Sequence, residues 1–203
     1  MRFVFASNNL HKLEEVRSIL PKSIEVMSLR EIGFLYEIDE TGETLESNSS
    51  LKARTVWDWV LIQSREGNTL VNNIDGVFAD DTGLEIASLG GLPGVRTARW
   101  AGEHANDAAN RHKCLEALSS IKNRQARFRT VITLIRQDFE QQVEGIVEGC
   151  IAEEESGNGG FGYDPVFIPN GYSQTFASLP TEIKNTISHR KRALEAMRQL
   201  LLT

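Results

Sequence analysis

Residues 3–20 read FVFASNNLHKLEEVRSIL, and this stretch decides the class of fold that the chain can adopt. The apolar run at residues 3–6 is typical of a short buried strand, and polar residues 7–9 end it. From Leu10 onward, apolar side chains recur at helical spacing until Pro21 closes the segment. A strand, a turn and a helix in this order form the context in which N–H groups at a helix start can contact a phosphate.

The rest of the chain alternates between strand and helix patterns. We expect helices from Thr44 or Ser47 past Trp59, from Asn106 or Asp107 to Leu118, and after a cap at Ser188. We expect strands over residues 24–29, 74–79, 128–135, 143–151 and 166–168, with the third and fourth forming a hairpin. This order predicts a mixed α/β fold on a central sheet. With 203 residues and no clear linker, a single domain over residues 1–203, with room for two lobes, is expected.

The bulk composition limits the partners of the protein. The formal net charge is −6, which argues against duplex DNA or RNA, although a local cationic cleft can still hold a small anion. No stretch approaches the ~18 apolar residues of a membrane span, and the apolar start is too short for a signal peptide. Cys114 and Cys150 match neither a disulfide framework nor a zinc site. We therefore expect a cytoplasmic enzyme or binding protein with a small-molecule partner and no nucleic-acid or membrane partner.

Three polar side chains, Ser7, Asn9 and Lys12, cluster at the predicted start of the first helix. A hydroxyl and an amide can donate hydrogen bonds to a phosphate, and the lysine ammonium is a suitable point charge for it. The alternative is a polar N-cap followed by a solvated lysine, which in isolation is the commoner meaning of this pattern. The G-x-x-x-x-G-K-[ST] spacing of a Walker phosphate loop is absent from the sequence.

Glu40 and the pair Asp80-Asp81 are the candidate metal ligands. Magnesium prefers oxygen ligands and typically takes one or two protein carboxylates plus substrate phosphates. The apolar run before Asp80 predicts a strand that ends at a sheet edge, in a turn at Thr82-Gly83. Neighbours on an extended chain point to opposite sides, so one aspartate would face the ion while the other orients water or caps the turn. An Asp-rich turn on the surface is the alternative.

Residues 160–165 combine two glycines, two aromatic residues and an aspartate. Glycine allows the backbone to approach a ligand closely. Phe161 is suited to stacking on a nucleobase, and Asp164 can accept hydrogen bonds from a base or orient the loop. The alternative is a β-bulge with aromatic side chains in the core, which fits Tyr163 better than Phe161.

Lys184, His189 and Arg190 form the last polar group. Lys184 and Arg190 are anion ligands, and His189 can donate a hydrogen bond to a carbonyl oxygen. The alternative is a basic first helical turn in water, but cations there oppose the helix dipole, which favours a functional reason. Carboxylates, cations and glycine-rich turns together indicate a metal-dependent nucleoside triphosphate hydrolase.

Taken in order, these motifs closely resemble the inosine triphosphate pyrophosphatase family, the non-canonical purine nucleoside triphosphate pyrophosphatases. The most specific pieces are ADDTGL at residues 79–84, GLPGV at 91–95, GFGYDPVF at 160–167 and ISHR at 187–190. The resemblance implies an elongated two-lobed α/β fold with a curved mixed β-sheet flanked by helices, a cleft between the lobes and a homodimer. It also implies Mg²⁺-dependent hydrolysis of dITP, ITP or XTP to the monophosphate and pyrophosphate, which cleanses the nucleotide pool.

The resemblance also implies a role for individual residues. Glu40 and Asp81 would hold the metal ion, and Asp81 or Asp80 would accept the proton of the attacking water. The substrate would be bound by residues from both halves of the chain, namely Ser7, Asn8, Asn9, Leu10, His11, Lys12, Lys52, Thr82, Phe161, Gly162, Tyr163, Asp164, Lys184, His189 and Arg190.

The chain departs from the family pattern at Ser47, where relatives commonly have Glu, and at Arg96, where they often have an aromatic residue. A Glu at position 47 would complete a capping box with Thr44 or support the metal site. Two other functions stay open. One is a pyrophosphatase of the septum-inhibitor type acting on pyrimidine nucleotides, which should lack the late motifs. The other is a nucleotide sensor without catalysis, against which Glu40 and Asp81 argue.

Overall fold

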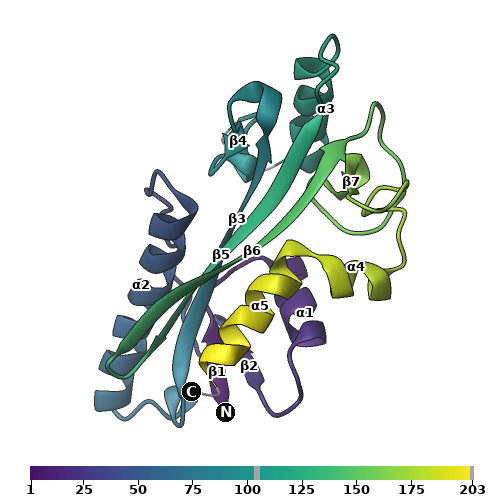
Figure 1. Ribbon diagram of the computed structural model, residues 1–203. Helices are drawn as coiled ribbons and strands as arrows, with labels where there is room; N and C mark the ends of the chain where they lie inside the picture. The colour runs from purple at the N-terminus through teal and green to yellow at the C-terminus, as the bar shows by residue number, and fades with distance from the viewer. Residues whose placement is uncertain (103–105, 202–203) are drawn as a thin grey trace. The chain divides into compact units, whose positions relative to one another are not determined.

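The computed structural model describes residues 1–102 and 106–201 (Figure 1). The chain divides into two compact units. Unit 1 contains Met1–Asp81, Thr130–Gly145 and the C-terminal segment from Ala193, and unit 2 contains Thr82–Arg129 and Ile146–Arg192. The single domain over residues 1–203 stays a prediction. Among the described residues, no helix has both the length and the apolar composition that crossing a bilayer requires.

In the described part of the chain, seven strands form one mixed sheet with the order β2-β1-β3-β5-β6-β7, and β4 pairs with β3. Strand β1 runs parallel to β2 and β3, whereas β4 is antiparallel to β3 and β7 to β6. The strands are β1 (Arg2–Phe5), β2 (Glu25–Ser28), β3 (Gly76–Ile86), β4 (Pro93–Gly94), β5 (Gln125–Arg136), β6 (Phe139–Ile151) and β7 (Phe167–Pro169). The predicted α/β class is confirmed.

The helices fall where hydrophobic periodicity and capping residues place them, except for one short helix near residue 184. They are α1 (Leu10–Ile19), α2 (Leu45–Arg65), α3 (Asp107–Ala117), α4 (Thr181–Ile187) and α5 (His189–Leu200). Short 3-10 turns occur at η1 (Thr69–Val71), η2 (Ala87–Leu89), η3 (Thr97–Arg99) and η4 (Asp164–Val166). Asn9, Thr44 and Asn106 cap α1, α2 and α3 with their side chains, so the predicted starts of these helices are confirmed.

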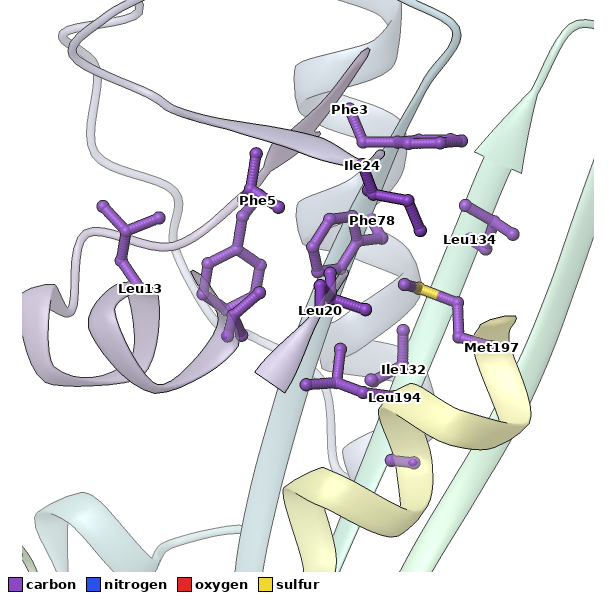
Figure 2. Close-up of a cluster of buried hydrophobic side chains, with 13 residues drawn as sticks. Phe3, Phe5, Leu13, Leu20, Ile24, Phe78, Ile132, Leu134, Leu194 and Met197 are labelled. Carbon is purple, nitrogen blue, oxygen red and sulfur yellow. The ribbon is translucent and has the colours of Figure 1, made fainter. Parts of the chain in front are cut away.

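One face of the sheet in unit 1 is covered by α1 and α5. Figure 2 shows Phe3 and Phe5 of β1 beside Phe78 of β3, with Leu194 and Met197 of α5 packed against them. The rings of Phe5 and Phe78 stack with their centroids 5.0 Å apart. Each such side chain contributes about 1.5–3 kcal/mol when it is fully buried, so this cluster fixes both helices on the sheet.

The opposite face of the sheet in unit 1 is covered by α2, as Figure 1 shows. Val4 of β1 and Val77 and Ala79 of β3 pack here against Ala53 and Val56 of α2. The side chains of β3 thus alternate between the two faces, as the pleat of a strand requires. The next two residues of β3, Asp80 and Asp81, continue this alternation between the two faces.

Unit 2 has its own apolar core between its part of the sheet and α3. Its members come from strands, α3 and the segments around β7, and include Leu84, Ile86, Cys114, Leu118, Phe128, Phe167 and Phe176. Both cysteines of the chain are free, and burial raises the pKa of the Cys114 thiol to about 12. Cys114 therefore packs as a small apolar residue.

The prediction that a strand ends in a turn at Thr82-Gly83, on a sheet edge, is wrong. Strand β3 continues to Ile86 and lies between β1 and β5. Leu84 and Glu85 pair with β4, so the sheet continues past the Thr-Gly dipeptide, and tertiary pairing overrides a weak local turn signal. The two aspartates therefore sit inside a long strand, where the backbone holds them rigidly.

The sequence analysis also missed α4. The motif that precedes the last helix is itself helical, and Pro180 stands immediately before its first turn, where proline is tolerated. The predicted cap of the last helix is confirmed, because the Ser188 hydroxyl accepts a hydrogen bond from the backbone N–H of Lys191 at 3.2 Å.

Candidate active site

Strand β3 presents its two aspartates to opposite faces of the sheet in unit 1. Asp80 shares the face of α1, and its carboxylate accepts a hydrogen bond from Lys12 Nζ at 2.9 Å. Asp81 shares the face of α2, and its carboxylate lies 3.3 Å from Lys52 Nζ. The opposed orientation predicted from the pleat is confirmed. Each aspartate is buried and each has a lysine partner from a different helix.

Lys52 joins Asp81 to a carboxylate that is remote in the sequence. Its ammonium donates to Glu40 Oε1 at 2.8 Å and lies within 3.3 Å of Asp81 Oδ1. Glu40 keeps 35% of its side-chain surface exposed, whereas Lys52 is nearly buried. Two acidic groups from a loop and a strand therefore converge on a single positive atom. We call Lys12, Glu40, Lys52, Asp80 and Asp81 the acid–lysine cluster.

The charges in the acid–lysine cluster are strongly coupled. Burial raises the pKa of Asp81, helped by the negative charges of Glu40 and Asp80, and this outweighs the attraction of Lys52 and Lys12. For Lys52, burial alone would lower the pKa, but the attraction of Asp81, Glu40 and Asp80 outweighs it and the net pKa is raised. Lys52 therefore stays protonated. A further cation beside the two carboxylates would stabilise their ionised forms.

Asn48 connects the Glu40 loop to Asp81 and was missed by the sequence analysis. Its side-chain oxygen accepts a hydrogen bond from Gly42 N at 2.7 Å, and its Nδ2 donates to Asp81 Oδ2 at 3.3 Å. Asn48 is fully buried and lies one helical turn before Lys52, a spacing that could have revealed it. A Cβ on Gly42 would lie 2.5 Å from the Asn48 oxygen, so this close approach requires glycine.

Residues 7–12 form the turn and first residues of α1. Asn9 is the N-cap and accepts a hydrogen bond from Lys12 N at 3.1 Å, while the Ser7 hydroxyl accepts from Asn9 N at 3.2 Å. The local polar pattern therefore builds the cap, and the Lys12 side chain reaches the acid–lysine cluster. Asn8, Asn9, Leu10 and His11 are exposed beside this helix start, so the role predicted for them in substrate binding stays a prediction.

The acid–lysine cluster fits a divalent cation of the magnesium type. Glu40 and Asp81 supply oxygen atoms, and the Lys52 ammonium already stands where a positive charge contacts both. Among the described residues there is no group of three or more His, Cys, Asp or Glu side chains suited to a metal ion. A pair of carboxylates is nevertheless sufficient for Mg²⁺, since this ion commonly completes its shell with water and substrate phosphates.

Unit 2 contains a second polar group, which we call the cation–aromatic cluster: Phe161, Asp164, Lys184, His189 and Arg190. The Asp164 carboxylate accepts hydrogen bonds from Lys184 Nζ at 2.6 Å and from Phe161 N at 2.8 Å. Lys184 Nζ lies 5.1 Å from the centroid of the Phe161 ring, and the Arg190 guanidinium carbon lies 5.8 Å from it. Two cations thus flank one half-buried aromatic ring.

Arg190 and His189 are held in fixed orientations at the start of α5. Arg190 is 1% exposed, and its Nη2 donates to the Thr82 hydroxyl at 3.2 Å. His189 packs edge-on against Phe128, and its Nδ1 accepts a hydrogen bond from Arg190 N at 2.9 Å. A neutral imidazole in this arrangement carries its proton on Nε2, which makes that nitrogen a donor.

Gly162 and Tyr163 contribute to unit 2 through their backbone and through packing. The Tyr163 ring lies in the core, its hydroxyl donates to Thr97 O at 3.1 Å, and burial raises its pKa. Any substrate contact of Tyr163 would therefore come from its backbone. The Gly162 N–H donates a hydrogen bond to Asp107, and the Gly162 carbonyl accepts one from Arg111. Both partners lie on α3, and the sequence analysis missed them. No sequence pattern marks such side-chain contacts to a distant backbone.

Carboxylates suited to a divalent cation, and cations beside an aromatic ring, are groups that a nucleotide hydrolase can use. The chain belongs to the Ham1 family, whose model matches residues 3–200. The resemblance found in the motifs is thereby confirmed, and it covers nearly the whole chain.

Relatives of known name agree with this family. The chain is 48% identical over 202 residues to a dITP/XTP pyrophosphatase of Porphyromonas gingivalis, covering 99% of this chain and 97% of the relative. It is 46% identical over 201 residues to the dITP/XTP pyrophosphatase of Flavobacterium johnsoniae, covering 99% and 98%. Among solved structures, the Staphylococcus aureus Ham1 protein matches with a TM-score of 0.83 and 34% identity, covering 99% of this chain and 98% of that one.

Proposed function

We propose that this protein hydrolyses non-canonical purine nucleoside triphosphates, dITP, ITP and XTP, to the monophosphate and pyrophosphate, and that it requires Mg²⁺. The observation that carries the proposal is the convergence of Glu40 and Asp81 on the Lys52 ammonium. Membership in the Ham1 family and relatives named dITP/XTP pyrophosphatase support the substrate class. Removal of such triphosphates would keep them out of nucleic acids.

In this proposal Glu40 and Asp81 hold the divalent ion. When bound, the ion would neutralise charge on triphosphate oxygens as pyrophosphate leaves. Lys12 and Lys52 supply further positive charge, and both ammonium groups already lie within 3.3 Å of a carboxylate in the cluster. Little covalent work falls to the protein, so alignment and charge placement account for most of the rate.

The proton of the attacking water goes to Asp81 or Asp80. Asp81 is the acceptor that the family resemblance implies, and its carboxylate lies 3.3 Å from Lys52 Nζ beside the proposed metal site. Asp80 is engaged by the Lys12 ammonium at 2.9 Å, and we assign it the role of holding Lys12 in place for the phosphates.

Base selection belongs to the cation–aromatic cluster. Phe161 would stack on the base, and His189, with its proton on Nε2, would donate to the 6-oxo group of a purine. Adenine presents an amino donor at this position, so a donor would face a donor. A site built to hydrogen-bond one group can reject an analogue that lacks it by ~10⁴-fold.

A substrate panel with coupled pyrophosphate detection tests the function. The panel contains ITP, dITP, XTP, ATP, dTTP and UTP, each with Mg²⁺ and each with chelator. We expect the first three to release pyrophosphate far faster than ATP, and only with the metal ion. Comparable turnover of ATP and ITP would refute the base selectivity. Preferred turnover of dTTP or UTP would indicate the pyrimidine enzyme, and tight ITP binding without pyrophosphate would indicate a sensor.

A homodimer and a cytoplasmic location complete the proposal. Both rest on the family resemblance. Light scattering coupled to gel filtration checks the first, and it should give twice the chain mass of 22.7 kDa. The mass of a single chain across the working concentration range would contradict the proposed homodimer.

A further inference from the structure

A long loop carries Phe161 and contains no strand or helix of its own. Residues 152–163 connect β6 to η4, and loops of this length in a compact unit are often functional. Phe161 is flanked by Gly160 and Gly162, both in the left-handed region with φ of +72° and +61°. Glycine loses much conformational freedom on folding, so the position of Phe161 depends on contacts from outside the loop.

Helix α3 supplies such contacts at the residue next to Phe161. Asp107 Oδ2 accepts a hydrogen bond from Gly162 N at 2.8 Å, and Arg111 Nη1 donates to Gly162 O at 3.0 Å. Asp107 and Arg111 are four residues apart, which places them on one side of the helix. Both hydrogen bonds involve an ionised group and are therefore stronger than bonds between neutral partners. The Gly162 residue is held at its N–H and at its carbonyl.

Arg111 also reaches a second point of the same loop. Its Nε lies 2.9 Å from Glu155 Oε2, and only 16% of the Arg111 side chain is exposed. One guanidinium therefore joins the acidic start of the loop, at Glu155, to the glycine-rich end at Gly162. The contact with Glu155 is an ion pair, since Arg111 Nε has no hydrogen-bond partner among the described residues, whereas Arg111 Nη1 donates a hydrogen bond to Gly162 O.

Helix α3 is itself a firm platform within unit 2. Cys114 and Leu118 bury their side chains in the core. Asn110, which is 1% exposed, accepts from Ala101 N at 2.7 Å and donates to Ala98 O at 2.9 Å. The helix that holds the Phe161 loop is thus tied to the core and to the neighbouring η3 segment.

We propose that Asp107 and Arg111 of α3 are positioning residues that set the place of Phe161, and through it the affinity of the enzyme for the purine base. This inference deepens the proposed function and rests on it, because Phe161 is there the stacking platform for the base. The residues act through the Gly162 peptide and need no contact with the substrate. Since the base lies away from the reacting phosphorus, their loss weakens binding and leaves the chemical step nearly unchanged.

The test compares Arg111→Gln and Asp107→Asn with His112→Gln, an exposed change on the same helix. Wild-type turnover of ITP is measured first, and its absence would sink the proposed function and the positioning role together. With that activity present, we expect each of the first two variants to raise the KM for ITP about tenfold, as loss of a hydrogen bond to a charged group does, with kcat within about twofold. His112→Gln should change neither constant.

A double-mutant cycle with Phe161→Ala separates positioning from a general loss of structure. In the Phe161→Ala background, Arg111→Gln should raise KM by less than about twofold, because the ring that it positions is gone. Melting temperatures by circular dichroism show that the variants fold. An unchanged KM in both α3 variants, with wild-type turnover intact, would overturn the positioning role alone. Full additivity with Phe161→Ala, or a fall in kcat as large as the rise in KM, would also overturn it.

Discussion

The acid–lysine cluster and the cation–aromatic cluster reach fixed geometry by different routes. In the first, β3 carries the two aspartates and helices α1 and α2 carry the two lysines, so that Glu40 is its one member on a loop. In the second, Phe161 sits on an irregular loop, and hydrogen bonds from other elements to backbone atoms hold it. The difference predicts that the proposed metal site depends mainly on regular elements, whereas the proposed stacking of a base on Phe161 depends on contacts made to an irregular loop.

The comparison predicts a large kinetic effect and no stability loss at Asp81. Asp81→Asn should lower kcat/KM by at least ~10²-fold, as loss of a preorganised charged group does. Because the folded-state pKa of Asp81 is raised, its favourable contribution to stability is present only at low pH and is lost as pH rises through that pKa. At neutral pH the variant should melt no lower than wild type. Pyrophosphate release and thermal melts at pH 7 measure both.

Asp80→Asn, on the opposite face of β3, is the matched control for Asp81→Asn. Asp80→Asn removes the carboxylate that accepts from Lys12 and keeps Glu40 and Asp81, the pair proposed to bind the metal ion. It should cost less activity than Asp81→Asn. A loss of activity at Asp80 equal to that at Asp81 would contradict the division of roles between the two aspartates.

Phe161→Ala should affect binding rather than the chemical step. Base–aromatic stacking contributes about 1–3 kcal/mol, which corresponds to a rise in KM of roughly 5- to 150-fold. Stacking is tolerant of base identity, so the ratio of ITP to XTP turnover should stay near its wild-type value. Steady-state kinetics with both substrates check this. A lower kcat with unchanged KM would place Phe161 in the catalytic machinery and would weaken the comparison between the two clusters.

Asn48→Ala tests whether the Glu40 loop and Asp81 are joined by one side chain. The change removes the acceptor of Gly42 N and one of the donors to Asp81, and a buried unsatisfied group costs about 1–3 kcal/mol of unfolding free energy. The Mg²⁺ concentration for half-maximal activity should rise as the two ligands lose alignment. Urea titration and a metal titration measure these effects, and a wild-type metal requirement in a destabilised variant would contradict the link.

Ser47→Glu should have the smallest effect. Ser47 already completes a capping box with Thr44, because its hydroxyl accepts from Thr44 N at 3.1 Å. A Glu at this third helical position can make the same bond and adds favourable charge at the helix start, about 0.3–1 kcal/mol. We expect a slightly higher melting temperature and an unchanged Mg²⁺ requirement. A much tighter metal requirement would show that residue 47 supports the metal site.

The regular parts of the molecule could be predicted from sequence because their signals are local. Periodicity and caps located α1, α2 and α3, and the apolar runs located β1 and the hairpin of β5 and β6. The continuation of β3 past Thr82-Gly83 could not, since it depends on pairing with the distant β4. Helix α4 was missed because its apolar pattern spans fewer than two turns.

The candidate site divides in the same way. The opposite orientation of Asp80 and Asp81 could be predicted because they are neighbours on a strand. The contact between Glu40 and Lys52 could not, because it depends on the path of the loop that precedes α2. Helix α3 contacts the Phe161 loop at the backbone N–H and carbonyl of Gly162, groups that every residue except proline carries. Only a structure reveals which of these a side chain selects.

The central claim is that Glu40 and Asp81 bind one divalent ion together. This ion would bind beside Lys52 and replace the contacts that Lys52 now makes with both carboxylates. The most direct measurement is anomalous X-ray diffraction from crystals grown with Mn²⁺ and a non-hydrolysable ITP analogue. The account predicts a single anomalous peak bound to one oxygen of each carboxylate, with the Lys52 ammonium turned toward phosphate. A peak bound to neither carboxylate, or an ion that leaves Lys52 bridging Glu40 and Asp81, would contradict it.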